Sequence, residues 1–570
     1  MSPFRRFLST RHPAWRAVGW LLVLAIAGST GLFMARGPRA LKPGAAAYPG
    51  EGTQGRFGTF VEHLGSGTFA LSYDTIEGTR EEVRLGKVAG RLEEPGTVWG
   101  MVSPSATRQA GAWTLMGPLQ VEAKDLEGVL TGRGFMTDPR PALGWNQGVW
   151  TGLGPLVWDD LEGSGQGRWF LPAGWTRSLD GRFKVARGPV RWEAAHPGAL
   201  QTLTASTMEA TLGFQEGTLG GVDARLDGGA VQAHRVDITL PTVTFLAPVT
   251  FQRGDGWTGS AEGGVAPRPP KGQPFDQMEF RQFQATRPIE GGTEAVNAQG
   301  ARWTSAGLRL EGDVRLEQPA DKATAILRAP RVLQRTGPGP DLPADLREGE
   351  TWAEPQAVLT WGPRTLSSPR MIGRHRTRTW RVQAPVLGRG ELGTFSAGAG
   401  EGSTRRWVFK GPIQARFFDG ALVRGDQLVW EDGAMTLTGR PVTWTRLRQR
   451  LTGMKVQRMG DVVRFPEGIS GALAGQGGDI NLQADKADAR GSLLNLDGRV
   501  TCTGEGWRLQ ADRISVTLGP GNTVKQISAN GSVVLKGRMG EGRGEALDLD
   551  PVNQAAKWHG GVRAVTEVRP

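Results

Sequence analysis

Apolar and polar residues alternate along short runs that dominate the C-terminal half of the chain. Clear examples are Trp507–Ala511, Ile514–Leu518 and Ala546–Leu549. An alternation of period two is typical of a β-strand with one buried face. Turn-forming residues separate the runs, as at Gly519–Asn522, and no long amphipathic helix lies between them. The pattern therefore predicts an all-β chain of antiparallel strands rather than βαβ units.

These runs recur at a regular interval along the chain. The first Val or Ile of each run lies 27 to 33 residues from the next, at Ile413, Val442, Ile469, Val500, Val533 and Val562. A period of about 30 residues over six units indicates a repeat architecture. We expect two strands per unit, one for each wall of a folded-over antiparallel sheet, which makes an elongated, repetitive β-jellyroll. About 17 units at ~4.8 Å per strand predict a body of roughly 80 Å.

The same unit is looser in the N-terminal half, and two proline-rich segments interrupt it. They are residues 266–274 and 336–344. We predict an N-terminal β-repeat region over 59–335, a linker or loop at 336–345, and a second β-jellyroll region over 346–570. The alternative is a long loop within one continuous structure.

An apolar stretch without charge covers residues 17–35. At ~1.5 Å per residue it spans roughly 28 Å, close to the thickness of a bilayer core. Four arginines precede it, so we predict a single-pass inner-membrane anchor with residues 1–16 in the cytoplasm and the body in the periplasm. The alternative is a cleaved signal peptide that leaves a soluble periplasmic protein. Residues 36–58 are rich in Gly, Pro and Ala and predict a flexible spacer.

Composition supports a β structure and argues against nucleic-acid binding. The chain has 85 glycines, 20 tryptophans and only 2 tyrosines in 570 residues. Interior glycines destabilise helices, whereas they suit turns and bends. The net charge is +12, but residues 1–42 contribute seven basic residues and no acidic ones. The remaining body is only mildly basic, so we expect no nucleic-acid partner.

The residues with chemical potential are few and scattered. Cys502 is the single cysteine and lies in an alternating run, so it is expected to be a small buried residue. The six histidines show no metal-ligand spacing. Gly388–Gly393 matches GxGxxG but does not lead into a helix pattern. We therefore predict no enzyme activity, no metal site and no cofactor, and expect the tryptophans to fill a β core.

The last third of the chain resembles a known family. Ala511-Asp512 precedes a strand, Gly531-Ser532-Val533 opens another, and Asp550-Pro551 and Gly561-Val562 follow. This order is similar to the OstA-like domain of the lipopolysaccharide-transport periplasmic proteins, the LptA and LptC types, most clearly over about 410–570. The LptC type is usually shorter, and the many Trp-Gly pairs of the N-terminal half lie outside the family pattern.

The resemblance implies a β-jellyroll that shields acyl chains and passes lipopolysaccharide or a similar envelope lipid toward the outer membrane. It also implies partners that join by edge-strand pairing, namely an inner-membrane ABC extractor and an outer-membrane translocon. Two alternatives remain open, a structural or adhesive exported β-repeat protein and a carbohydrate-active β-repeat enzyme. The candidate lipid-groove residues are Ile469, Ile480, Leu482, Val500, Leu509, Ile514, Val516, Val533, Leu535, Leu547 and Leu549.

Overall fold

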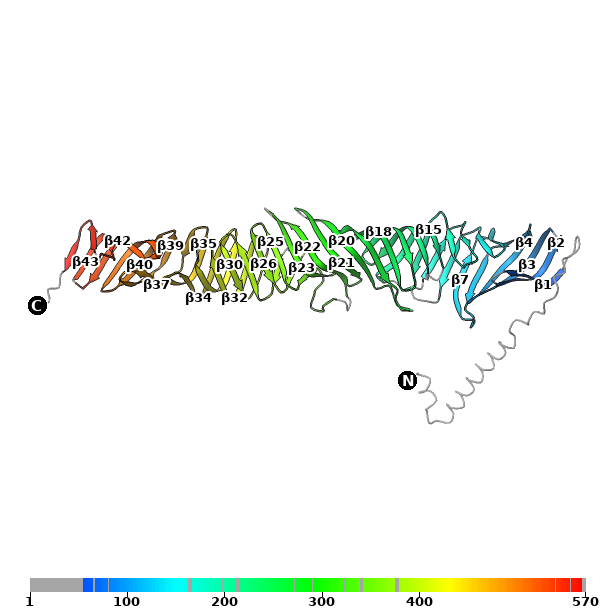
Figure 1. Cartoon of the computed structure of the whole chain (residues 1–570), viewed down its shortest axis with the longest axis horizontal. Coiled ribbons are helices and arrows are strands. Elements are labelled where there is room, and N and C mark those ends of the chain that lie inside the picture. The colour runs from blue at the N-terminus through cyan, green and yellow to red at the C-terminus, as the bar shows by residue number, and fades with distance from the viewer. Residues whose placement is uncertain are drawn as a thin grey trace, which may run out of the picture. The chain divides into compact units, whose positions relative to one another are not determined.

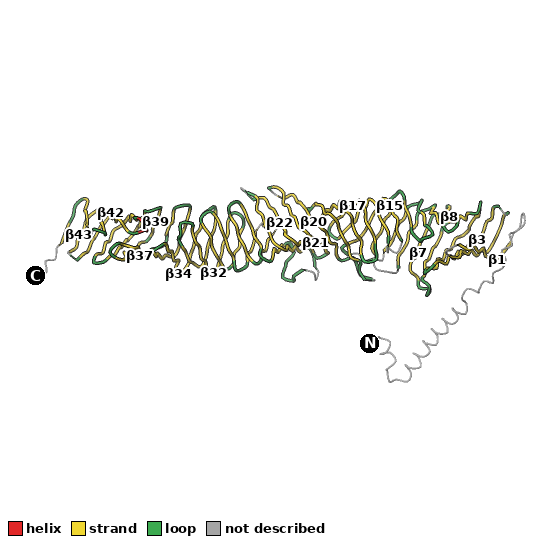
Figure 2. The backbone as a smooth tube through the Cα atoms, viewed as in Figure 1, coloured by secondary structure: helices red, strands yellow, loops and turns green. Residues whose placement is uncertain are grey.

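The computed structural model describes residues 55–565 except for short gaps. The gaps are 65–66, 80, 162–166, 197, 212–215, 271, 290, 321–322, 339–341, 375–378, 539 and 554. The described residues form β-strands joined by turns and loops, with one short 3₁₀ segment at Pro520–Asn522 and no α-helix (Figures 1 and 2). The all-β, antiparallel prediction is confirmed. No helix within this part of the chain is long and apolar enough to cross a membrane. The predicted anchor at 17–35 lies outside the described residues.

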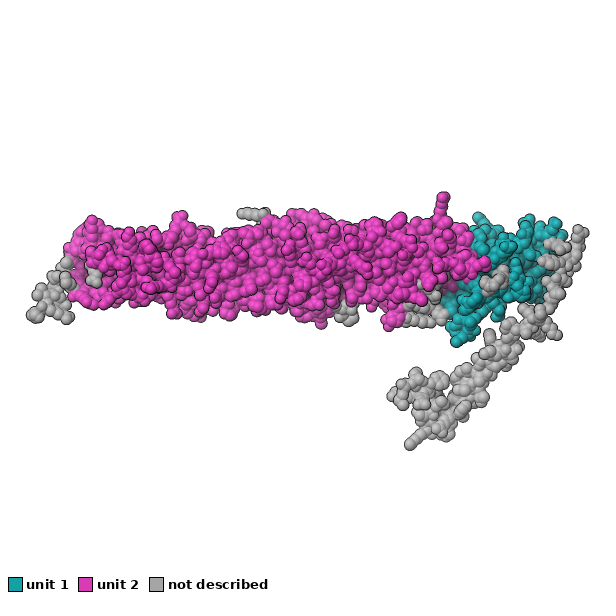
Figure 3. Space-filling model, in the orientation of Figure 1, with its two compact units in different colours: residues 1–154 teal, residues 155–570 magenta. Residues whose placement is uncertain are grey.

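The chain divides into two compact units, one on each side of the Gly154–Pro155 bond (Figure 3). In unit 1 the described strands are β1 (Gly55–Leu64), β2 (Gly67–Gly78), β3 (Glu82–Glu94), β4 (Thr97–Gln109), β5 (Ala112–Met116), β6 (Leu119–Lys124), β7 (Leu130–Met136), β8 (Pro141–Asn146) and β9 (Val149–Gly152). β1 begins within the predicted spacer of residues 36–58, so the spacer prediction is wrong for residues 55–58, which already pair with β2. Buried aromatic rings hold this unit together. Phe69 stacks on Trp145 at 4.1 Å, and Trp99 meets Trp150 edge-on at 5.1 Å.

Unit 2 begins with short strands and continues with long ones. The short strands are β10 (Leu156–Asp160), β11 (Gly167–Leu171), β12 (Thr176–Arg177), β13 (Phe183–Val185) and β14 (Val190–Ala194). The first long strands are β15 (Leu200–Ala210), β16 (Gly217–Leu226), β17 (Gly229–Ile238), β18 (Thr242–Arg253), β19 (Thr258–Pro267), β20 (Gln277–Ile289), β21 (Gly292–Thr304), β22 (Gly307–Pro319) and β23 (Thr324–Arg335).

Eight short strands follow, and then long strands return. The short strands are β24 (Glu350–Glu354), β25 (Ala357–Trp361), β26 (Arg364–Ser368), β27 (Met371–Arg374), β28 (Thr379–Val382), β29 (Val386–Gly390), β30 (Gly393–Ala397) and β31 (Ala399–Gly402). The later strands are β32 (Arg406–Phe417), β33 (Leu422–Glu431), β34 (Ala434–Arg446), β35 (Gln449–Met459), β36 (Val462–Phe465), β37 (Ile469–Gly475), β38 (Gly478–Ala484), β39 (Lys486–Arg490), β40 (Leu493–Gly504), β41 (Trp507–Leu518), β42 (Val524–Gly537), β43 (Gly540–Asp550), β44 (Ala555–His559) and β45 (Arg563–Val565).

The short strands of residues 350–402 reveal two walls. The C-terminal half of β23 pairs with β24 and its N-terminal half pairs with β25. One ladder then runs β25–β26–β29–β30 and a separate ladder runs β24–β27–β28–β31. Both ladders rejoin in β32, which pairs with β30 and β31. Each long strand therefore contributes one half to each wall, and the walls meet at a corner in the middle of the strand.

A β-bulge marks this corner in the long strands. The pairing register shifts between Asp497 and Val500 in β40, between Gln510 and Arg513 in β41, and between Asn530 and Val533 in β42. A bulge bends a strand locally, so one strand can pass from one wall to the other. The prediction of one strand per wall in each unit was wrong for this reason. Each unit of about 30 residues therefore extends both walls by two strand spacings, or about 10 Å, along the direction in which the strands follow one another. The predicted arrangement would extend them by only one spacing, or about 5 Å.

The predicted repeat has a structural cause. Ile413, Val442, Val500 and Val533 are each the first inward-facing residue after a bulge, and all are at most 2% exposed. Ile469 begins β37 and is buried as well. Each long strand has one corner, and a unit contains two strands. The interval of about 30 residues is therefore the number of residues from one corner to the next but one along the chain. Val562 is the exception, because it lies outside the strands and is 43% exposed.

Asp and Gly residues from neighbouring strands fit together at the corners. Gly531 has a φ of +75°, and a Cβ there would lie 2.6 Å from the Asp512 carboxylate. Gly498 has the same φ, and a Cβ there would lie 2.8 Å from the Asp485 carboxylate, which accepts hydrogen bonds from Arg499 at 3.0 and 3.1 Å. L-residues with side chains rarely adopt this backbone conformation. The Ala-Asp and Gly-x-Val motifs of the sequence are thus corner motifs.

The far ends of the strands meet along a seam, which we define by hydrogen bonds between hairpins of opposite walls. Trp303 donates its indole N–H to the Asp227 carbonyl at 3.2 Å, and the Gln449 amide donates to the Asn522 carbonyl at 3.1 Å. These partners lie 76 and 73 residues apart. The Leu200 N–H similarly donates to the Phe275 carbonyl at 3.3 Å. The strands that connect the partners are β17–β21, β35–β41 and β15–β19 in turn, so the seam coils along the unit.

Both proline-rich segments close parts of this seam. The segment at 266–274 ends at buried Phe275, whose ring meets Trp192 edge-on at 5.9 Å. The loop between β23 and β24 inserts Leu342 into an apolar cluster with Leu333 and Trp352. Strand pairing continues on both sides of this loop, from β23 to β24 and β25. The predicted boundary at 336–345 stays a prediction about separate folding regions, and its described residues, 336–338 and 342–345, belong to no strand.

The corner geometry makes Gly531→Ala a direct test of the fold. We expect this change to destabilise the protein by about 1–2 kcal/mol, because alanine disfavours a positive φ. Gly477→Ala is the matched control, since that glycine has open space around its missing side chain. Thermal unfolding followed by circular dichroism measures both variants. Equal melting temperatures for the two would contradict the proposed role of the corner glycine.

Candidate functional site

The candidate site is the interior of unit 2, the space between the two walls. Ten of the eleven predicted groove residues point into it and are at most 4% exposed. They are Ile469, Ile480, Leu482, Val500, Leu509, Ile514, Val516, Val533, Leu547 and Leu549. Leu535 occupies an inward position near the end of the unit and is half-buried.

Cross-strand pairing arranges these residues in rows on the two walls. Leu482 pairs with Cys502, which pairs with Leu509, which pairs with Leu535. Beyond the corner, Val516 lies in a second row that reaches Leu549 through Ile527. Ile514 and Leu547 lie in a neighbouring row through Ala529. The structure thus brings the predicted residues together as facing apolar rows rather than as a single stripe.

Aromatic rings fill the interior further toward the N-terminus. Sixteen of the eighteen tryptophans that the structure describes are buried. Trp361 stacks with Trp407 at 6.2 Å and lies 5.4 Å from Trp430, while Phe395 meets Trp430 edge-on at 5.5 Å. Gly390 provides the space for this cluster, since a Cβ there would lie 2.4 Å from the Trp430 ring. The expectation that tryptophans fill the core is confirmed.

A tryptophan also covers the C-terminal end of the interior. Trp558 lies on β44 and pairs with Leu547 of β43, and its ring lies against Gly542 and Gly544 of β43. A Cβ at either glycine would lie 2.7 or 2.8 Å from that ring. Trp558 is half-buried, so the last inward side chain lies at the boundary between the interior and solvent.

The other residues singled out in the sequence have ordinary structural positions. Cys502 is buried, and this burial raises the pKa of its thiol to about 12. The four histidines within the described residues are exposed, while His12 and His375 lie outside them. Gly388–Gly393 forms the hairpin between β29 and β30. Among the described residues no group of acidic, His or Cys side chains is arranged to hold a metal.

Buried charges were not predicted from the sequence. Glu294 is 1% exposed, accepts hydrogen bonds from Arg287, and accepts another from the Gln318 amide at 2.5 Å. Glu354 lies between Arg331 and Arg370, at 2.5 Å from each. Burying a charge is costly unless it is paired and hydrogen-bonded, and these carboxylates are. A single carboxylate in an alternating run carries no signal that its side chain points inward.

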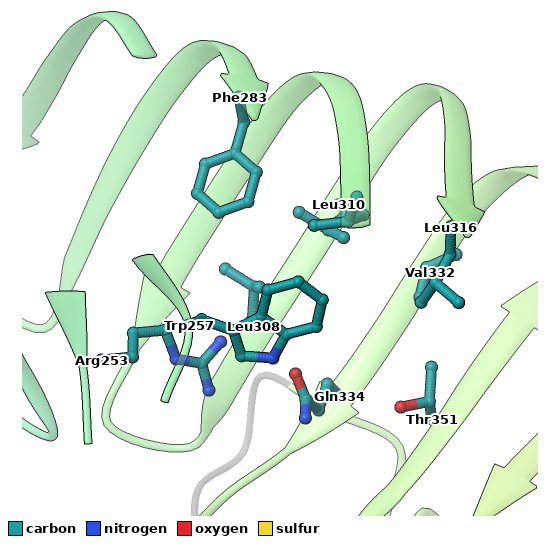
Figure 4. Close-up of a pocket in the computed structure, with 10 residues that line it drawn as sticks. Arg253, Trp257, Phe283, Leu308, Leu310, Leu316, Val332, Gln334 and Thr351 are labelled. Carbon is teal, nitrogen blue, oxygen red and sulfur yellow. The ribbon is translucent and has the colours of Figure 1, made fainter. Parts of the chain in front are cut away.

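Two hollows differ in location and chemistry. One is an enclosed cavity of about 20 Å³ just inside the seam, lined mostly by apolar side chains together with Arg253, Trp257, Gln334 and Thr351 (Figure 4). The other is an open depression of about 580 Å³ over β35, β37, β38, β40 and β41. Its lining is mainly polar and includes Arg450, Asn481 and Arg508. The enclosed cavity belongs to the interior, and the open depression lies among outward-facing residues.

The fit between Gly390 and Trp430 gives a test of how tightly the aromatic part of the interior is packed. We expect Gly390→Ala to lower stability by about 1–3 kcal/mol, because overpacking a filled core forces neighbours to move. The double variant Gly390→Ala/Trp430→Leu should recover part of this loss by removing the clashing ring. Chemical denaturation of the three proteins measures the effect. Full tolerance of the single change would show that the ring has free space beside it.

Comparison with known proteins adds no family assignment. No protein-family model matches the chain, and no curated protein matches it. The likeness to the OstA-like domain therefore depends on the residues of the last third of the chain.

Proposed function

We propose that the chain is a non-enzymatic, membrane-anchored carrier that moves lipopolysaccharide or a similar envelope lipid toward the outer membrane. The observation that supports this proposal best is the continuity of the interior. Most inward positions on both walls are apolar from Leu203 on β15 to Leu549 on β43, and buried charged side chains such as Arg253, Glu294 and Glu354 lie among them. Such an interior suits long alkyl chains, because burial of apolar surface is favourable and non-directional.

The energetics of such a carrier favour movement over tight binding. Each methylene that leaves water contributes about 0.8 kcal/mol, wherever along the interior it is placed. An alkyl chain of the lipid that lies beside one row of side chains therefore has nearly the same free energy as one that lies beside the next row. The walls must separate to admit it, since the inward side chains now contact one another.

The seam is the route that this proposal gives to the lipid. At the corners the main chain is continuous, so the walls cannot part there without breaking strands. At the seam the walls are connected by individual hydrogen bonds, such as those from Gln449 to Asn522 and from Leu200 to Phe275. A hydrogen bond of this kind contributes only about 0.5–1.5 kcal/mol net. Opening the seam while the corners bend leaves both ladders intact.

Localisation and partners form part of the same proposal. Residues 17–35 would anchor the chain in the inner membrane, with the body in the periplasm. Within the described residues, β1 pairs only with β2, and β44 and β45 pair only with β43. Open edges of this kind can pair with strands of other proteins. We propose an inner-membrane ABC extractor and an outer-membrane translocon as the partners.

A structural or adhesive β-repeat protein is the second candidate function. The observation that favours it is the close packing of the interior, where Trp430 fills the space above Gly390 and Leu509 and Phe409 are fully buried. A protein of this kind would keep its walls closed and bind no lipid. Lipid content of the purified protein separates the two candidates.

A photo-crosslinking amino acid placed at four positions tests the carrier function. Leu509 and Val516 point inward and are at most 1% exposed, whereas Arg508 is exposed and Ser515 donates a hydrogen bond to the Asn495 side chain at 2.8 Å. We expect lipid to be captured at 509 and 516 and not at 508 or 515. Thermal unfolding of each variant verifies that the fold is retained.

Two results would count against the carrier. Equal labelling at all four positions would show that lipid only coats the surface. Native mass spectrometry that finds no lipid on the purified chain, together with no crosslink at 509 or 516, would favour the structural protein.

A further inference from the structure

The enclosed cavity near the seam contains hydrogen-bond donors in an apolar setting. Arg253 ends β18 and Trp257 precedes β19, so both belong to one hairpin. The Arg253 N–H and the Trp257 carbonyl close this turn at 2.7 Å. Both side chains point into the interior toward Leu308 (Figure 4). The hairpin therefore delivers a charged group and an indole N–H to the inner side of the seam.

The Arg253 guanidinium is only partly satisfied by the protein. It is 4% exposed, its Nη2 lies 3.2 Å from the Asp255 carboxylate, and it lies 5.3 Å above the Trp303 ring. Its Nη1 has no hydrogen-bond acceptor among the described residues. Burial and the nearby Arg287 lower the pKa of Arg253, and Asp255 counteracts them. A buried donor without an acceptor is costly, and Arg253 lines a cavity that has room for an acceptor atom.

Trp257 adds a second donor of the same kind. It is 4% exposed, and its Nε1 also has no acceptor among the residues that the structure describes. The Arg287 guanidinium covers the ring at 4.7 Å. Arg287 itself pairs with Glu294. The indole N–H is thus a buried donor in a setting where each of the two nearby guanidinium groups is paired with a carboxylate, so an acceptor atom from a ligand would satisfy it.

The size of the cavity matches one oxygen atom. Its volume is about 20 Å³, and a space of roughly 10–15 Å³ already holds one water-sized atom. Leucine, valine and phenylalanine side chains form most of the remaining lining, among them Phe283, Leu310 and Val332. An oxygen at this place would have donors on one side and an apolar wall on the other. That arrangement fits an amphiphile better than a freely hydrated ion.

We propose that Arg253 and Trp257 form a binding point for the anionic oxygen of a lipid, a carboxylate or a phosphate, whose alkyl chain continues between the walls. This inference deepens the proposed carrier function and rests on it. One anionic oxygen accepts from both donors at once, and hydrogen bonds between charged groups are the strong ones. The site at the seam would thus select anionic chains from neutral ones as they pass inward.

Binding of three probes to the detergent-solubilised full chain tests this inference. The probes are dodecanoate, dodecyl phosphate and methyl dodecanoate, and the method is native mass spectrometry at neutral pH with stepwise addition. The two charged probes carry a carboxylate and a phosphate group, and the methyl ester has the same alkyl chain but no charge. We expect the wild-type chain to bind at least one charged probe about ten times more tightly than the ester.

Two substitutions assign the preference to the proposed residues. Arg253→Met should remove the preference for the charged probe, about tenfold, and leave ester binding unchanged. Trp257→Phe keeps the ring and removes only the N–H, so it should weaken charged-probe binding a few-fold. Arg508→Met is the control, since it removes an exposed outward arginine. If Arg253→Met fails to fold, the Trp257→Phe result and the wild-type preference carry the test.

The outcomes separate this inference from the proposed function. Equal wild-type affinity for charged and neutral probes, or an unchanged preference in Trp257→Phe and Arg253→Met, would overturn the binding point while the carrier survives. Failure of the wild-type chain to bind any of the three probes would overturn both, with the cavity then holding water only.

Discussion

A β-sheet with one apolar face must cover that face, and this constraint shapes the whole of unit 2. The alternating pattern makes one side of every strand apolar, and no helical layer lies over it within the described residues. The sheet covers itself instead, by bending each strand at a bulge so that two halves of the same ladder face each other. At some of these bulges a residue has a positive φ, and glycine supplies it at Gly498 and Gly531. The corner, the repeat and the apolar interior are therefore consequences of one requirement.

The high glycine and tryptophan contents of the chain are related, because a large ring on one wall needs a small residue opposite it. Facing walls at a fixed separation leave room for large side chains only where the opposite position is small. Trp430 lies against Gly390, and Trp558 lies against Gly542 and Gly544. The aliphatic rows near Leu509 and Val516 achieve the same closure with branched side chains from both walls. The aromatic part of the interior is thus more tightly interlocked, and the aliphatic part has the composition better suited to exchange with alkyl chains.

Much of this architecture is readable from sequence because alternation and repeat length are local properties. Ten of the eleven predicted groove residues are buried, because the alternation of apolar and polar residues alone shows which side chains of a strand face the interior. The corner was not predicted. The β-bulge at Asp497–Val500 hardly changes the alternation of apolar and polar residues, so the sequence pattern gives no sign of it. The seam and the Arg253–Trp257 site were missed for a different reason. The seam joins residues about 75 positions apart, and the hairpin of Arg253 and Trp257 meets Trp303 and Leu308 about 50 positions further along the chain. One sequence carries no signal for contacts of that range.

Separation of the walls at the seam is the central claim of the carrier account, and a reversible lock across it is the most direct test. Gln449→Cys and Asn522→Cys place two thiols where the walls are hydrogen-bonded, in a Cys502→Ala background that leaves no other cysteine. Oxidation joins the pair as a disulfide, and lipid uptake by the full chain is then measured by native mass spectrometry. The account predicts that locking reduces lipid uptake near β34–β42 and that reducing the disulfide restores it. Unchanged uptake in the fully locked protein would contradict access through the seam.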